Sequence, residues 1–132
     1  MDDLTLWKNA GNLGNKYDID EIKEDVDGLH ILLTDINTGR RILLFYDCLV
    51  CSYKNTDESF WMDSLYRLAK KYDMDFITGH TFFQVLDSSY AKEVETGGQG
   101  VVQADRLFHL KIIGANAILD IVSWGMPEIR SV

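Results

Sequence analysis

The segment that decides the fold covers residues 29–47 and reads LHILLTDINTGRRILLFYD. Two apolar runs, residues 29–36 and 40–47, flank the short loop Asn37-Thr38-Gly39. Runs rich in Ile, Leu and aromatic residues on both sides of a loop with glycine are typical of an antiparallel hairpin. We therefore predict two paired strands here, and an antiparallel sheet as the framework of the molecule.

The segment after this hairpin predicts the main helix, residues 57–72. Residues 48–53 first continue the apolar run, as a bend or a further strand. Thr56 or Asp57 can then cap the helix, and lysines at positions 70 and 71 suit its C-terminal end. Apolar side chains with helical spacing form one stripe: Trp61, Leu65, Leu68 and Tyr72.

The remaining segments predict further strands and one short helix. Residues 76–86 favour extended structure, and a second helix over residues 88–95 can begin at an Asp87 or Ser88 cap. Residues 97–104 read as an exposed loop, residues 107–113 and 117–124 as a second hairpin, and Pro127 lies in a C-terminal tail. The fold class is therefore α+β: an antiparallel sheet built from hairpins, with the main helix on one face. Strand order does not follow from the sequence.

Length and composition indicate a single domain with its own core. The chain has 132 residues, of which 46% are hydrophobic and 26% charged, and no repeat or low-complexity tract divides it. Residues 1–27 form an acidic N-terminal arm, with eight acidic residues against three lysines and a local net charge of −5. We expect Trp7 to pack this arm onto the domain.

The overall charge limits the classes of partner. Twenty-one acidic against 13 basic residues give a net charge of −8, opposite in sign to a typical nucleic-acid binder. The start Met1-Asp2-Asp3 lacks the basic region of a secretory signal, and the longest strongly apolar stretch is residues 42–46. We expect a cytoplasmic protein that binds neither nucleic acid nor a membrane.

Motifs for metal, cofactor or redox chemistry are incomplete. Cys48 and Cys51 form a CxxC, but a redox pair favours a helix N-terminus and a zinc site needs further ligands. The segment Gly98 to Gln103 lacks the third glycine of a GxGxxG motif. We therefore expect ordinary half-buried cysteines, no metal, no cofactor and no catalytic residue.

The three histidines leave one chemical alternative open. His30, His80 and His109 each lie near a strand end or in an apolar run, but their spacing matches no metal or catalytic motif. His109 alternates with Lys111, which favours a solvent-exposed strand face for both. Whether these histidines converge in a pocket cannot be derived from their spacing.

The acidic arm admits two interpretations. It can serve solubility, or its acids can form a patch that attracts a basic protein. In the second case, the aromatic residues among the acids are the natural anchors. The predicted partner-binding residues are Trp7, Tyr17, Asp18, Asp20, Glu21, Glu24, Asp25, Asp27 and Tyr53.

Several short segments resemble a group of small bacterial proteins. They are residues 42–47 (ILLFYD), 52–58 (SYKNTDE), 83–89 (FQVLDSS) and 118–129 (ILDIVSWGMPEI), together with His109. Some members of that group are encoded beside polymorphic toxins and are regarded as candidate immunity proteins. The resemblance implies no catalytic residue, and the cysteines lie outside its pattern.

These observations lead to a functional hypothesis with alternatives. We expect a non-enzymatic interaction module, most concretely an immunity-type inhibitor that blocks a basic toxin through an acidic surface. The alternative is a small enzyme or ligand-binding domain that uses histidines in a pocket. Self-association through an exposed strand edge is a third route, and the oligomeric state is not determined by the sequence.

Overall fold

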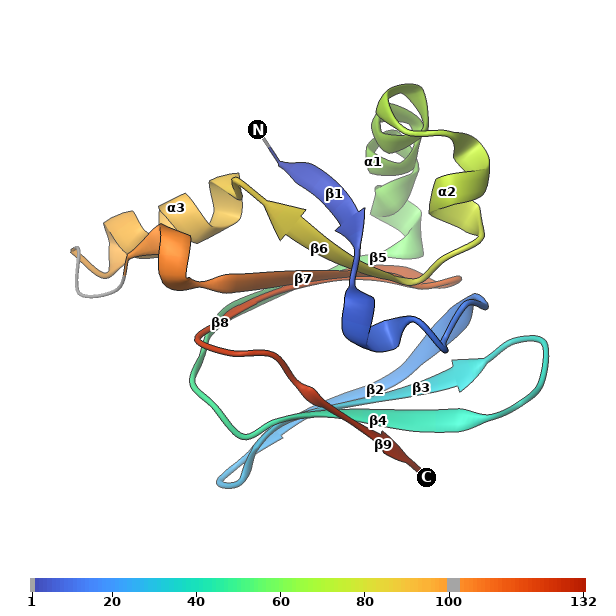
Figure 1. Ribbon diagram of the computed structural model, residues 1–132, viewed down its shortest axis with the longest axis horizontal. Coiled ribbons are helices and arrows are strands. Elements are labelled where there is room, and N and C mark those ends of the chain that lie inside the picture. Colours follow the sequence, from blue (N-terminus) through green and yellow to red (C-terminus); the bar gives the residue numbers. More distant parts are fainter. Residues whose placement is uncertain (1, 100–102) are drawn as a thin grey trace.

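The computed structural model describes residues 2–99 and 103–132, with the backbone alone at residues 58–61. It shows an α+β fold of two antiparallel sheets, which confirms the predicted fold class. The sheets stack face to face, and the helices lie on the far side of one of them (Figure 1). The molecule therefore has a helix layer, a five-stranded sheet and a four-stranded sheet.

The four-stranded sheet grows from the hairpin that the sequence predicts. β3 (Gly28–Asp35) pairs with β4 (Arg41–Tyr46), and β2 (Tyr17–Asp25) and β9 (Glu128–Ser131) add to the two sides in the order β2-β3-β4-β9. Burial alternates residue by residue along β3 and β4. One side of this sheet therefore faces the core and the other side faces away from it.

The five-stranded sheet contains the second predicted hairpin at its centre. This hairpin is β7 (Phe108–Ile113) with β8 (Ala117–Ser123). β6 (Phe82–Leu86) and β1 (Asp3–Leu6) extend it on one side, and β5 (Val50–Asp57) on the other. Both sides of β7 and β8 are buried, because helices cover one face and the second sheet covers the other.

The helices confirm two predictions. α1 (Glu58–Lys71) and α3 (Ser89–Gly97) match the predicted main and short helices. The Ser88 hydroxyl caps α3 by accepting a hydrogen bond from the backbone N–H of Ala91 at 3.0 Å. A third helix, α2 (Met74–Thr78), and two 3-10 turns, Lys8–Ala10 and Ala104–Arg106, complete the elements.

The core lies mainly between the two sheets. Trp7, Tyr17, Tyr46 and Phe82 are its buried aromatic residues, and the inward Leu and Ile side chains of both sheets fill the rest. A second cluster between the five-stranded sheet and helices α1 and α2 contains Ile77 and Phe83. Helix α3 covers a third, smaller cluster around Tyr90 and Val122.

Three regions differ from the sequence predictions. Residues 76–78 are helical rather than extended, because Ile77 is buried in the second cluster and this packing outweighs local strand propensity. The predicted C-terminal tail forms β9, which pairs with β4. The predicted acidic arm supplies β1 to one sheet and β2 to the other, so it is part of both sheets.

Within the residues that the structure describes, none of the helices has both the length and the apolar character required to span a bilayer.

Candidate functional site

The four-stranded sheet has an outer face, by which we mean the side turned away from the core. In the described part of the chain, no helix covers it (Figure 1). Its centre contains half-buried apolar side chains, and its borders are charged. The outer face consists of Asp18, Glu21, Lys23 and Asp25 of β2, His30, Leu32 and Thr34 of β3, Arg41, Leu43 and Phe45 of β4, and Glu128 and Arg130 of β9.

Most of the predicted acidic residues lie along β2, which is an edge strand. A bulge between Ile19 and Glu21 shifts the register, and Asp20 at this bulge accepts a hydrogen bond from the Thr34 hydroxyl. Asp20 therefore joins the border of the outer face. Four of the six predicted acids share this border: Asp18, Asp20, Glu21 and Asp25.

Asp25 is the acid of this border with the most local partners. Its carboxylate accepts a hydrogen bond from the backbone N–H of Asp27 at 2.9 Å, and His30 Nε2 and Lys23 Nζ lie 3.3 and 3.7 Å from it. The Asp27 hydrogen bond is the main reason that the pKa of Asp25 lies below its ordinary value. Asp27 itself is exposed in the turn between β2 and β3.

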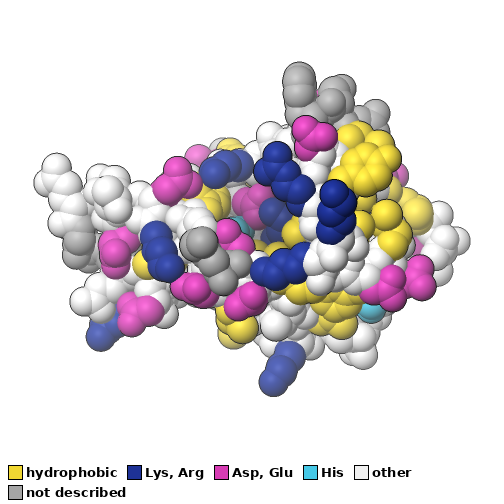
Figure 2. Space-filling view, turned by 90° about the horizontal axis from the view of Figure 1, so that it is seen from above, with side chains coloured by type: hydrophobic (Ala, Val, Ile, Leu, Met, Phe, Trp, Pro, Cys, Tyr) yellow, Lys and Arg dark blue, Asp and Glu magenta, His cyan; other side chains and the backbone are white. Residues whose placement is uncertain are grey.

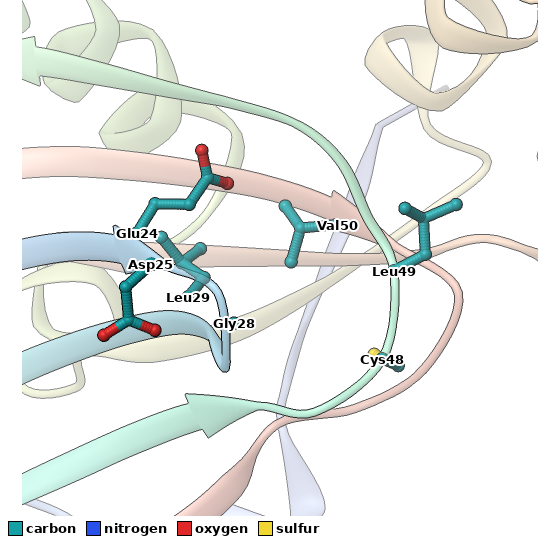
Figure 3. Close-up of a pocket in the computed structure, with 7 residues that line it drawn as sticks. All are labelled: Glu24, Asp25, Gly28, Leu29, Cys48, Leu49 and Val50. Carbon is teal, nitrogen blue, oxygen red and sulfur yellow. The ribbon is translucent and has the colours of Figure 1, made fainter.

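Glu24 points away from the outer face. Figure 3 shows the Glu24 and Asp25 side chains leaving β2 in opposite directions. Glu24 is paired in register with the buried Leu29 and lines an open groove of about 450 Å³ together with Cys48, Leu49 and Val50. The sheet alternation thus separates Glu24 from the acids on the outer face.

The predicted aromatic anchors do not lie on this surface. Trp7 is 2% exposed and packs beside Phe108, which confirms that it anchors the N-terminal segment. Tyr17 is also 2% exposed and packs against Phe82 in the core. Tyr53 is 37% exposed but lies on β5, in the other sheet. No predicted aromatic residue therefore joins the β2 acids.

The apolar centre of the outer face consists instead of Leu32, Leu43 and Phe45. His30 and Arg130 pack on the Phe45 ring, at 4.8 and 4.6 Å from its centroid. Sequence analysis missed this centre because residues 42–46 are apolar on both faces of the strand. Alternate residues of an apolar run cannot be assigned to core or surface without the pairing partners.

The structure separates the three histidines. His30 lies on the outer face, and His80 lies between α2 and β6, where its Nδ1 is 3.0 Å from the Phe76 carbonyl oxygen. His109 lies on the helix-covered side of the five-stranded sheet. Among the described residues no group of three His, Cys, Asp or Glu side chains is arranged to hold a metal ion.

The prediction of a solvent-exposed His109 was wrong, since this residue is 5% exposed. Its Nδ1 lies 2.7 Å from Ser88 Oγ, and its Nε2 lies 2.7 Å from an oxygen of Asp120. Lys111 Nζ is 3.2 Å from both oxygens of the same carboxylate. Helix α3 covers the strand face here, so a position that alternation assigned to solvent is buried.

The Ser88, His109 and Asp120 side chains form a chain of hydrogen bonds. Because the Ser88 oxygen already accepts from Ala91 N–H, its own proton is free to be donated to Nδ1. The Asp120 carboxylate can only accept, so Nε2 of His109 carries a proton and donates it to Asp120. Both ring nitrogens are engaged, so His109 positions Asp120 and fastens the start of α3 to the sheet.

Beside this network, a second region opens between α1 and α3. It is a cleft of about 330 Å³ on the helix side of the five-stranded sheet. Figure 2 shows this side, with Lys and Arg side chains around a hollow. The cleft is lined by Asp2, Leu4, Lys54, Ser64, Arg67, Leu68, Val85, Ser89, Tyr90, Glu93, His109, Lys111 and Asp120.

The Asp120 and Asp2 carboxylates that line the cleft are already paired. Burial acts to raise the pKa of Asp120, but the His109 hydrogen bond and the Lys111 charge outweigh it, and the pKa lies below its ordinary value. Asp2 accepts hydrogen bonds from the backbone N–H and the hydroxyl of Ser89, at 2.7 and 2.6 Å. Its carboxylate thereby occupies the N-terminus of α3.

The two cysteines have separate surroundings. Cys48 lies beside Gly125 and lines the groove between the sheets, whereas Cys51 packs against the cluster under α3. Both are free and half-buried. The interrupted glycine motif, Gly98 to Gln103, extends over residues 100–102, which lie outside the described residues.

Comparisons with protein-family models, curated proteins and solved structures found no match to this chain.

Proposed function

We propose that this protein is a non-enzymatic binding module that engages a basic protein through its outer face, as an immunity-type inhibitor of a toxin in the bacterial cytoplasm would. One observation carries the proposal: an uncovered sheet face has an apolar centre and an acidic border. The centre is formed by Leu32, Leu43 and Phe45, and the border is the set of β2 acids. This combination supplies both contact area and long-range attraction.

The charges on the two sides of the outer face determine which partner surface fits it. The β2 border contains four acids and Lys23, whereas the β4 and β9 side contains Arg41 and the ion pair of Arg130 with Glu128. A complementary surface is therefore basic where it meets β2 and apolar at its centre. A net charge of −8 increases the rate of encounter with such a partner at low salt.

The test is binding to the protein encoded by the neighbouring gene, measured by surface plasmon resonance at about 50 and about 300 mM salt. Association should slow as the salt concentration rises, because the steering charges are screened. Absence of saturable binding, or binding independent of salt, would contradict the proposal.

A matched pair of variants locates the surface. D18K/E21K should slow association by about tenfold, because it reverses two charges on the β2 border. D63K/D105K makes the same change in net charge at exposed positions elsewhere, and should leave association close to that of the wild type. Equal effects from both variants would show that net charge, and not the outer face, governs binding.

The variant Phe45→Ala tests the contribution of direct contacts to binding, as distinct from long-range electrostatic attraction. An anchor at the centre of an interface contributes about 2 kcal/mol or more, which corresponds to about 30-fold faster dissociation. Because Phe45 also packs against His30 and Arg130, circular dichroism should first establish that the variant is folded. An unchanged dissociation rate in the folded variant would exclude Phe45 as an anchor.

Ligand binding is a second candidate function, favoured by the position of His109 beside Asp120 in the cleft. The geometry supports binding rather than acid–base catalysis, because neither ring nitrogen of His109 is left for a substrate.

A further inference from the structure

The cleft between α1 and α3 has more hydrogen-bond donors than acceptors available to a ligand. Arg67 lines it, is exposed, and has no hydrogen-bond or ion-pair partner among the described residues. Lys54 lies over the Tyr90 ring at 4.1 Å, and its Nζ is 3.6 Å from Glu93, beyond hydrogen-bond distance. Arg67 and Lys54 together therefore leave several N–H groups without acceptors.

Among the described residues, two of the three carboxylates in the cleft already accept hydrogen bonds, and the third, Glu93, is 71% exposed and forms an ion pair with Lys54 at 3.6 Å. Asp120 receives hydrogen bonds from His109 and Lys111, and Asp2 receives two from Ser89. Lys111 is 18% exposed at its side chain and has a third N–H besides the two directed at Asp120. Within the part of the chain that the structure describes, Arg67 has no acceptor, and the Asp120 and Asp2 carboxylates already have donors. An anionic oxygen group therefore suits the cleft better than a cation does.

The apolar side chains that line the cleft indicate that the uncharged part of the ligand is apolar. Leu4, Leu68 and Val85 line it on the side of β1, β6 and α1, and the Tyr90 ring lies toward α3. A volume of about 330 Å³ is within the range of pockets that hold small molecules. An apolar body of about one ring can lie against these side chains while its charged end meets Arg67 and Lys54.

We propose that this cleft binds a small organic anion, a phosphate ester or a carboxylate with an apolar body, whose oxygens are held by Arg67, Lys54 and Lys111. The hydrogen bonds from Ser88 through His109 to Asp120 fix the charges at the base of the cleft before the ligand arrives. Such preorganisation reduces the cost of binding. This site lies on the helix side of the five-stranded sheet and is independent of the outer face.

The experiment is a titration of the full ¹⁵N-labelled chain with phenyl phosphate and, separately, benzoate, followed by amide chemical shifts. Saturable shifts should appear at Val85, Tyr90 and Lys111 with at least one probe, and the stronger probe identifies phosphate or carboxylate as the preferred group. The neutral probe benzyl alcohol should bind at least about tenfold more weakly.

Two variants and one matched control test the assignment. R67Q and K54Q should each weaken binding of the stronger probe by about tenfold, because each removes a charge-assisted hydrogen bond. K70Q removes a charge from the same helix as Arg67 at an exposed position outside the cleft, and should bind like the wild type.

Three results would overturn the inference: shifts that do not saturate with either anion, equal binding of benzyl alcohol, or an unchanged affinity in R67Q. Arg67 and Lys54 are exposed, so these variants are expected to fold.

Discussion

The charged pairs of the outer face and of the cleft differ in how far they are buried. On the outer face, Lys23 and Asp25 lie 3.7 Å apart with side chains 62% and 31% exposed. In the cleft, Lys111 and Asp120 lie 3.2 Å apart with side chains 18% and 15% exposed. Water screens the first pair, which can change partners at little cost, whereas the second pair must keep its hydrogen bonds. The outer face is therefore suited to steering and the cleft to a fixed geometry.

Asp120→Ala should have the largest effect on stability. It leaves Lys111 and His109 without the carboxylate that satisfies them, and breaking such a buried pair costs about 3–5 kcal/mol. Urea unfolding measures the loss. Asp25→Ala on the outer face is the comparison and should cost much less, because water screens the charge of this carboxylate. Similar losses in the two variants would remove the distinction between the regions.

Gly28→Ala should destabilise the molecule by about 3 kcal/mol. Gly28 has φ +138°, and an added Cβ would lie 2.1 Å from the Tyr46 carbonyl oxygen. The substitution also disturbs the turn that joins the acidic strand β2 to β3. Thermal unfolding monitored by circular dichroism provides the measurement, and an unchanged melting temperature would show that this turn can relax.

Lys16 is a half-buried charge, and it should make the stability of the protein depend on pH in the alkaline range. Its Nζ donates to the carbonyl oxygens of Ile77 and His80, and burial lowers its pKa from 10.5 to about 8. Between these values the unfolded chain binds more protons than the folded chain, so stability rises with pH.

The free energy of unfolding of the wild type, relative to Lys16→Gln, should therefore rise by about 2 kcal/mol between about pH 7.5 and about pH 9.5. Urea titrations of both proteins across this range measure the difference. A constant difference would mean that Lys16 retains an ordinary pKa when folded.

Tyr46→Phe should stabilise the four-stranded sheet by about 1 kcal/mol. The Tyr46 side chain is fully buried, and its hydroxyl has no hydrogen-bond partner in the described part of the chain. Removing this hydroxyl removes an unsatisfied polar group and leaves the ring in place. Urea unfolding at neutral pH decides the outcome, and a loss of stability would indicate a partner such as a buried water.

D18N/E21Q should change the free energy of unfolding by no more than about 0.5 kcal/mol. Both residues lie on the border of the outer face, where solvent screens their charges. Differential scanning calorimetry can measure the change. A larger change would mean that the β2 acids serve stability, which would weaken the case for a binding role.

The elements that depend on interactions between neighbouring residues were predicted correctly, and those that depend on distant contacts were missed. The two hairpins, α1 and α3 were predicted because they depend on local periodicity, turn residues and caps. α2 and β9 were missed because Ile77 is held by distant core residues and β9 by pairing with β4. Trp7 was predicted correctly as an anchor, since a large aromatic residue in a polar segment has few other ways to be buried.

The candidate sites depend still more on distant contacts. The β2 acids were visible as a cluster in the sequence, but alternation and a bulge decided that Glu24 leaves the outer face and Asp20 joins its border. The cleft could not be predicted, because Arg67, His109 and Asp120 come from three elements. Their spacing matches no motif.

By itself, the sequence determined the α+β class, the two hairpins, the main helix and the concentration of acids near the N-terminus, because these are properties of neighbouring residues. Only the tertiary structure decided which side of each strand is covered. The same alternation that the sequence displays places Phe45 toward solvent and His109 beneath a helix, since one sheet face was left open and the other was not. Burial is a property of what packs on a residue, and that partner is distant in the chain.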